Sequence, residues 1–99
     1  MFEIGKINQL IMRITAIVNY AKDIHYTVHG DAFFGKHLFA DKLDSNGNEY
    51  LDLLKEVCVL GRGYQTLPSE DYLKGAIEYL PALDVDDVKN FENIKGLIK

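Results

Sequence analysis

The chain has 99 residues, of which 47% are hydrophobic and 26% are charged, a balance typical of one globular domain rather than of a disordered chain. Eleven basic and fifteen acidic side chains give a formal net charge of −4, which argues against a general nucleic-acid-binding surface. A single cysteine, Cys58, together with the lack of a signal-peptide pattern and of an apolar run of about 18 residues, predicts a cytoplasmic protein with no membrane span.

The first predicted element is a helix over about residues 3–28. Its apolar side chains recur three and four residues apart, and they include Ile4, Ile7, Ile11, Ile14 and Val18. One heptad further the same stripe reaches His25, so we expect His25 to face the interior. Gly30 is predicted to end this helix and Asp31 to cap the next one.

The second predicted helix extends from Ala32 to about Leu60 and ends at the glycines of residues 61–63. The side expected to pack on the first helix carries Phe39, Leu43, Tyr50, Leu54 and Val57. Residues 44–48 have the composition of a turn, which leaves two alternatives. We favour a continuous helix, at a cost of about 1 kcal/mol for Gly47, over a helix that is broken at this segment.

Two short helices are predicted after residue 63. The first covers about residues 70–80, with Ser69 as its N-cap and Pro81 beyond its end. The second begins at Asp84, and its apolar residues are Val85, Val88, Phe91, Ile94 and Ile98. No segment has the alternating pattern of a strand, so we predict an all-α fold and a single domain over residues 1–99.

Five side chains that can bind a metal ion lie in and just before the second helix: His25, His37, Asp41, Asp52 and Glu56. His37 and Asp41 are four residues apart, as are Asp52 and Glu56, and the eleven-residue step between the pairs returns to within about 20° of the same direction. The four side chains therefore share one stripe, together with Phe34, Leu38 and Val59. A mixed set of imidazoles and carboxylates on helices favours iron or manganese.

The two pairs of the second helix cannot bind one ion if that helix is unbroken, because eleven residues rise about 16 Å and ligands lie within about 2–2.6 Å of an ion. Two antiparallel copies would solve this problem, since a two-fold axis between Asn46 and Gly47 places each pair opposite the other pair of the second copy. Gly47 would then let the two backbones approach each other. If the helix is broken at residues 44–48, the two pairs meet within one chain instead.

The run HYTVHGDAFFGKHLFAD from His25 to Asp41, followed by Asp52 and Glu56, resembles the ferroxidase signature of the Dps family, the mini-ferritins. The spacings of 12, 4, 11 and 4 residues match that signature, and the likeness covers about residues 7–63. It implies a ferritin-like fold in which two long antiparallel helices and short C-terminal helices form a four-helix bundle by dimerisation. It also implies that His25, His37 and Asp41 of one subunit and the two carboxylates of its partner bind iron. Fe(II) would be oxidised there with peroxide or oxygen, an activity linked to oxidative stress.

The resemblance also implies cofactors and partners. Iron would be bound as one ion or as a di-iron pair, with manganese or zinc as substitutes, in a homodimer or a larger shell. Tyr26, His29 and Asp44 are candidates for the groups around the ligands, and Tyr26 replaces the tryptophan of the family. No basic N-terminal tail is present, so we do not expect DNA binding, and the short region 64–99 replaces two long helices of the family. The alternative function is that of a non-catalytic helical homo-oligomer with a vestigial metal site.

Overall fold

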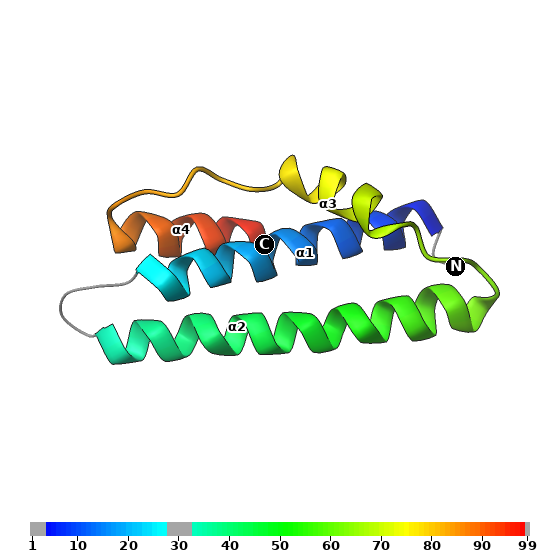
Figure 1. Ribbon diagram of the computed structural model, residues 1–99, viewed down its shortest axis with the longest axis horizontal. Coiled ribbons are helices and arrows are strands. Elements are labelled where there is room, and N and C mark those ends of the chain that lie inside the picture. Colours follow the sequence, from blue (N-terminus) through cyan, green and yellow to red (C-terminus); the bar gives the residue numbers. More distant parts are fainter. Residues whose placement is uncertain (1–3, 28–32, 99) are drawn as a thin grey trace.

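A computed structural model describes residues 4–27 and 33–98, and two long antiparallel helices dominate it (Figure 1). They are α1 (Ile4–Thr27) and α2 (Phe33–Leu53), and the molecule measures 48 × 23 × 22 Å. The predicted bounds of the first helix thus agree with α1 to one residue at each end. Gly30 and Asp31, which were predicted to separate the two helices, lie outside the described residues.

The second long helix continues without a break through residues 44–48 and beyond Leu53. It passes into a π-helical turn, η1 (Leu54–Val59), and a 3₁₀ turn, η2 (Leu60–Arg62). The continuous alternative is therefore confirmed, and the broken one is wrong. Polar side chains of the turn-like segment are compatible with a helix because they bond along it: Asn48 Nδ2 donates to Asp44 Oδ1 at 3.1 Å. Gly63 ends the run with φ 84°, a left-handed conformation that favours glycine.

The two short helices are α3 (Ser69–Ile77) and α4 (Asp87–Ile98), and both begin differently from the prediction. Ser69 is the first residue of α3, so the N-cap position predicted for it is occupied by Pro68, which makes no side-chain capping hydrogen bond. The last helix begins three residues later than predicted because Asp86 caps it, accepting a 3.0 Å hydrogen bond from the Val88 N–H.

Helix α1 lies at the centre of the molecule (Figure 1). α2 packs along one side of it, while α3 covers its N-terminal half and α4 covers its C-terminal half on the other side. Two buried clusters form the core. The cluster between α1, α2 and α4 comprises Tyr20, Ala21, Ile24, Ala40, Ile94 and Leu97. The cluster between α1, η1 and α3 comprises Ile7, Ile11, Val59 and Tyr72. The two short helices together thus cover the length of α1 as one long helix would. The described residues are all-α, and none of their helices combines the length and the apolar character needed to cross a membrane.

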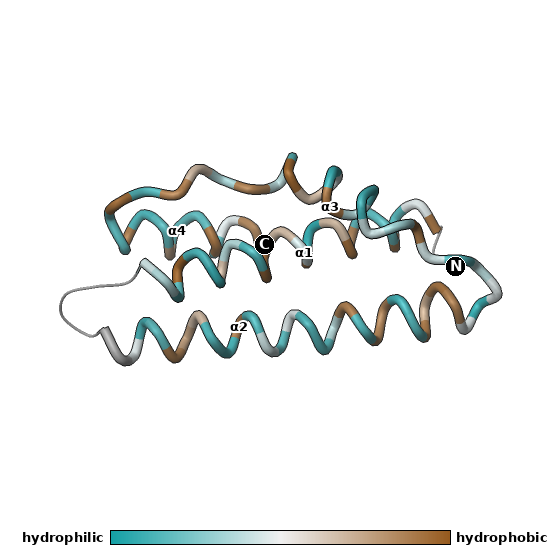
Figure 2. Tube along the Cα trace, in the orientation of Figure 1, coloured by the Kyte–Doolittle hydropathy of each residue, from teal (hydrophilic) through white to brown (hydrophobic). Residues whose placement is uncertain are grey.

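The side of α2 and η1 that packs on α1 agrees with the prediction only in part: Leu43 and Leu54 pack against the two buried clusters as predicted. Apolar and polar residues are interspersed along the whole helix (Figure 2), so apolar side chains lie on more than one side of α2. Phe39, Tyr50 and Val57 are 47%, 60% and 57% exposed, contrary to the prediction. The contact side instead includes Ala40 and Gly47, both buried. These small residues let α1 and α2 approach closely, which decides which apolar direction is covered.

Only some of the apolar residues named for the last helix are covered; Phe91 packs against the buried cluster. Ile94 is buried as expected, but Val88 and Ile98 are exposed and Val85 precedes the helix. The buried side chains of α4 are Asp87, Asn90, Ile94 and Leu97. Apolar spacing alone could not identify this side because half of it is polar.

Asn90 is buried because its amide completes a hydrogen-bond network. Its Oδ1 accepts bonds from the Tyr20 hydroxyl at 3.0 Å and from the Asp84 N–H at 2.8 Å. Its Nδ2 donates to the Asp84 carbonyl at 2.8 Å. The segment before α4 is thereby tied to the C-terminal half of α1, and both polar atoms of the Asn90 side chain have partners.

Candidate metal centre

His25 and His37 come together where α1 ends and α2 begins. The centroids of their rings are 3.8 Å apart and the ring planes are inclined at 34°. The contact follows from the antiparallel packing, which places the last turn of α1 beside the first turns of α2. Both side chains are partly buried, so His25 faces its partner histidine rather than the centre of the core. Two imidazoles twelve residues apart in the sequence thus form one nitrogen-rich position, a common ligand type for metals.

Asp41 follows His37 by four residues on α2, and its side chain is exposed. Side chains four residues apart lie on the same side of a helix, about one turn from each other. One end of the helical pair therefore carries two imidazoles and one carboxylate.

Asp52 and Glu56 are exposed in the other half of the helix, at the end of α2 and in η1. Since the helix is unbroken, about 16 Å of helical rise separates Asp41 from Asp52. Within the described residues, no three His, Cys, Asp or Glu side chains are grouped so that they could hold a metal ion. A single chain thus presents the proposed ligands as two separate sets, one with histidines and one with carboxylates only.

The stripe predicted to join these ligands to apolar side chains is present in part. Leu38 is 45% exposed, as expected for a residue on the outer side of α2. Val59 is fully buried against Ile7 and Ile11, contrary to the prediction. The π-helical turn explains the error, because it contains more residues per turn and rotates Val59 towards α1. The Phe34 side chain lies outside the described part of the chain.

Gly47 does not have the role that the two-fold arrangement predicts for it. It is buried on the α1 side of α2, and a Cβ at this position would overlap the Cγ2 methyl of Val18. The missing side chain therefore permits close packing of α1 on α2 within one chain. A glycine that faces α1 cannot also lie on the outer side of α2, where a second copy would cross it.

The three candidates for groups around the ligands have different environments. The Tyr26 ring is 79% exposed and meets the His25 ring edge-on, with centroids 5.1 Å apart and planes at 89°. Asp44 accepts a hydrogen bond from Asn48 and lies 4.0 Å from the Lys22 ammonium, and neither partner is a proposed ligand. His29 lies outside the described residues.

Two lysines make contacts that the sequence pattern did not reveal. Lys36 forms an ion pair of 3.0 Å with Asp87, and Lys55 lies over the ring of Tyr72 with its ammonium 5.0 Å from the centroid. Both partners come from the short C-terminal helices. Their positions depend on how α3 and α4 pack, so no local signal in the sequence could have identified these pairs.

Comparisons of the chain with protein-family models, with curated proteins and with solved structures found no match. The resemblance to the mini-ferritins therefore rests on the spacing of the five candidate ligands and on the residues around them. Membership of that family stays a prediction.

Proposed function

We propose that this protein binds iron in the manner of a mini-ferritin and oxidises Fe(II) at sites shared between two copies of the chain. Each site would combine His25, His37 and Asp41 of one copy with Asp52 and Glu56 of the other. The observation that carries the proposal is the contact between the two imidazole rings, whose centroids are 3.8 Å apart. The two adjacent imidazoles, with Asp41 about one turn further along α2, would form the nitrogen-containing half of such a site.

The uncovered side of α2 supports a shared site. It carries exposed apolar side chains close to the carboxylates, among them Leu38 and Leu53, which are 45% and 51% exposed. Apolar groups on an exposed face favour contact with another surface. With Gly47 turned towards α1, an antiparallel crossing of two α2 helices would place Ser45 of one copy near Asn48 of the other, and both side chains are exposed.

The ligand set fits iron as a substrate. Imidazole nitrogens and carboxylate oxygens bind both Fe(II) and Fe(III), and the three carboxylates offset the additional positive charge of the oxidised ion. Each Fe(II) ion releases one electron. Two such electrons and two protons convert one hydrogen peroxide molecule to two waters. In this proposal Mn(II) and Zn(II) bind to the same residues and compete with iron.

Anaerobic addition of Fe(II), followed by peroxide, tests the proposal. We expect the ferric absorbance to rise in the unmodified protein and to be lost in the double variant Asp52→Asn/Glu56→Gln. The matched control is Asp71→Asn/Glu78→Gln, which removes the same two charges from exposed positions of α3 and the following turn and should leave the rise unchanged. The proposal fails if the unmodified protein shows no rise and elemental analysis finds no bound metal.

The exposed apolar side of α2 also favours a second candidate, a homo-oligomeric interaction protein whose metal site is not used. Such a protein would associate through apolar contacts of residues such as Leu53 and Val57, 51% and 57% exposed, without any ion. Sedimentation with and without Fe(II) separates the candidates. The second candidate is supported if the oligomer contains no bound iron and its mass and melting temperature do not change when Fe(II), Mn(II) or Zn(II) is added.

A further inference from the structure

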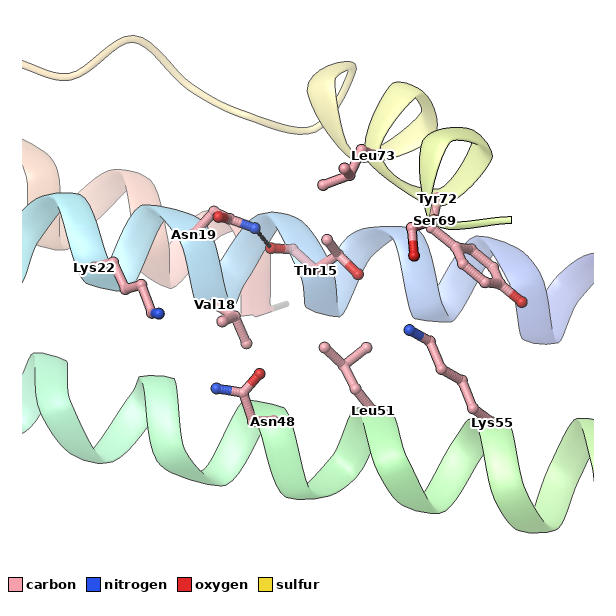
Figure 3. A pocket seen from close by; sticks show the side chains of 10 residues that line it. All are labelled: Thr15, Val18, Asn19, Lys22, Asn48, Leu51, Lys55, Ser69, Tyr72 and Leu73. Carbon is pink, nitrogen blue, oxygen red and sulfur yellow. Dashed lines mark hydrogen bonds between the residues drawn. The ribbon is translucent and has the colours of Figure 1, made fainter. Parts of the chain in front are cut away.

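A groove of about 300 Å³, lined by both polar and apolar side chains, lies where α1, α2 with η1, and α3 meet (Figure 3). α1 contributes polar side chains such as Asn19, and α3 contributes Ser69 and Leu73. Leu51 and Lys55 reach the groove from the opposite helix. This volume lies at the lower end of the range of about 300–1,000 Å³ that is typical of small-molecule sites.

Lys55 is held in the groove by a fixed aromatic ring. Its ammonium lies 5.0 Å from the centroid of Tyr72, in the range of a cation–π contact. Tyr72 is only 3% exposed, and its hydroxyl accepts a hydrogen bond from the Leu67 N–H at 3.1 Å and donates one to Asn8 Oδ1 at 3.0 Å. The ring is therefore held in place and presents one face to the ammonium.

The charge of Lys55 is not neutralised by the described part of the chain. No carboxylate among the described residues forms an ion pair within 4.0 Å of its ammonium. Lys22, at the other end of the groove, differs because it lies 4.0 Å from Asp44. Lys55 is a partly buried residue whose ammonium has no carboxylate partner among the described residues, in a protein with a net charge of −4. An external anion at this position would form a charge-assisted hydrogen bond with the ammonium.

The surroundings of Lys55 define the shape of such an anion. The Ser69 hydroxyl, at the first residue of the nine-residue α3, points towards the Lys55 side of the groove (Figure 3). Leu51 and Leu73 line the adjoining part with apolar surface. A charged group would therefore lie between the ammonium and the hydroxyl, and an apolar body would lie over the two leucines.

We propose that this groove binds a small organic anion, a carboxylate or phosphate monoester with a short apolar body, whose charged group is held by the Lys55 ammonium and the Ser69 hydroxyl. The site uses none of the candidate metal ligands. Its occupancy is therefore independent of the proposed iron chemistry, and it should persist in the Asp52→Asn/Glu56→Gln variant.

Titrations of the full chain followed by amide NMR shifts test the proposal with four probes: phenyl phosphate, benzoate, inorganic phosphate and neutral benzyl alcohol. We expect at least one aromatic anion to shift the amide signals of Lys55, Ser69 and Leu73, and benzyl alcohol to leave them unchanged. Comparison of phenyl phosphate with benzoate identifies the preferred head group, and weaker binding of inorganic phosphate shows that the apolar body contributes. If no aromatic anion shifts these signals, or if benzyl alcohol binds as well as benzoate, the proposal is overturned.

Three variants test the role assigned to Lys55. Lys55→Met keeps most of the side-chain length without the charge and should weaken binding of the aromatic anion about tenfold, as expected for a lost hydrogen bond to a charged group. Lys55→Arg keeps the charge and should preserve binding, and Lys89→Met removes an equal charge from an exposed position of α4 and should change nothing. Undiminished affinity in folded Lys55→Met would overturn the proposal. If that variant does not fold, the comparison of charged and neutral probes on the unmodified protein still decides.

Discussion

Replacement of Gly47 by alanine should destabilise the protein, although alanine is the better helix former. A Cβ at residue 47 would overlap the Val18 Cγ2 methyl, and the next atoms, Val18 Cβ and Ile14 Cγ2, are 3.8 and 3.9 Å away. Val18 cannot turn aside cheaply, because valine in a helix has one strongly preferred rotamer and this side chain is 5% exposed. The helices must therefore separate, or Val18 must adopt a strained rotamer.

The expected magnitude follows from two opposing contributions. Overpacking of a core costs about 1–3 kcal/mol, while the change from glycine to alanine in a helix contributes about 1 kcal/mol in favour of folding. We expect Gly47→Ala to lower the free energy of unfolding by about 1 kcal/mol. The matched control is Gly35→Ala in the same helix, where a Cβ would meet no atom within 4 Å. That control should raise the free energy of unfolding by about 0.5–1 kcal/mol.

Urea unfolding followed by circular dichroism measures both changes, and the two substitutions should have opposite signs. In thermal unfolding each kcal/mol corresponds to roughly 4–8 °C for a domain of this size. Val18→Ala should cost less stability in the Gly47→Ala background than alone, because it removes the overlapping methyl. If Gly47→Ala stabilises the protein as Gly35→Ala does, then the close contact of α2 with α1 at this position is refuted.

Two further substitutions test the polar groups that position α4. Asn90→Ala removes three hydrogen bonds of a buried amide and should cost about 2–3 kcal/mol in urea unfolding. Tyr20→Phe removes one of these three bonds, together with the contacts of the hydroxyl with the Ala82 carbonyl and Asn93, and should cost about 1–2 kcal/mol; unchanged stability in either variant would contradict the network. Lys36→Met removes the ion-pair partner of Asp87, whose side chain is 5% exposed, and should cost about 2 kcal/mol, less than a fully buried pair because Lys36 is 27% exposed. The same measurement on Lys89→Met should show almost no change, and an equal loss in both variants would contradict this role.

Helix positions could be predicted from the sequence better than helix faces. The apolar residues of α1 recur at helical spacing, so its bounds and the burial of Ile7, Ile11 and Val18 follow from periodicity. Tyr20, which is also buried, lies outside that stripe because α1 is covered on more than one side. α2 has apolar side chains in several directions, and the covered side is the one where Ala40 and Gly47 let α1 approach. The π-helical turn that buries Val59 has no signature in the composition. On α4 the buried Asn90 becomes favourable only once Tyr20 and Asp84 provide its partners.

The sequence could predict those features of the candidate metal centre that depend on the geometry of one helical pair, but not those that depend on a second molecule. The apposition of His25 with His37 follows from an antiparallel pair of helices that are separated by five residues in the sequence. The separation of Asp41 from Asp52 follows from helical rise once the helix is continuous. Which surface lies against Asp52 and Glu56 depends on how a second molecule docks. The sequence of one chain does not determine that docking. The sharing of the site between subunits therefore stays a prediction, and it needs a test of its own.

Mixing two inactive variants tests whether the proposed site is shared. In a two-fold dimer, the His25→Gln/His37→Gln variant keeps its carboxylate half, and the Asp52→Asn/Glu56→Gln variant keeps its histidine half. A heterodimer would unite the two intact halves at one of its two sites. Equal mixing with full subunit exchange gives half heterodimers, so we expect about a quarter of the unmodified oxidation rate.

The measurement is the initial ferric absorbance rise after Fe(II) and peroxide are added to the refolded mixture, with each variant refolded alone as its control. An affinity tag on one variant verifies exchange, because it must retain the untagged variant. Circular dichroism must show that both variants keep their helices. If tagged heterodimers form and the rate stays at the sum of the two separate controls, then histidines and carboxylates do not act together across the two-fold axis. Since the unbroken helix keeps Asp41 and Asp52 about 16 Å apart within a chain, that outcome would leave the five residues without a common ion and would refute the shared iron site.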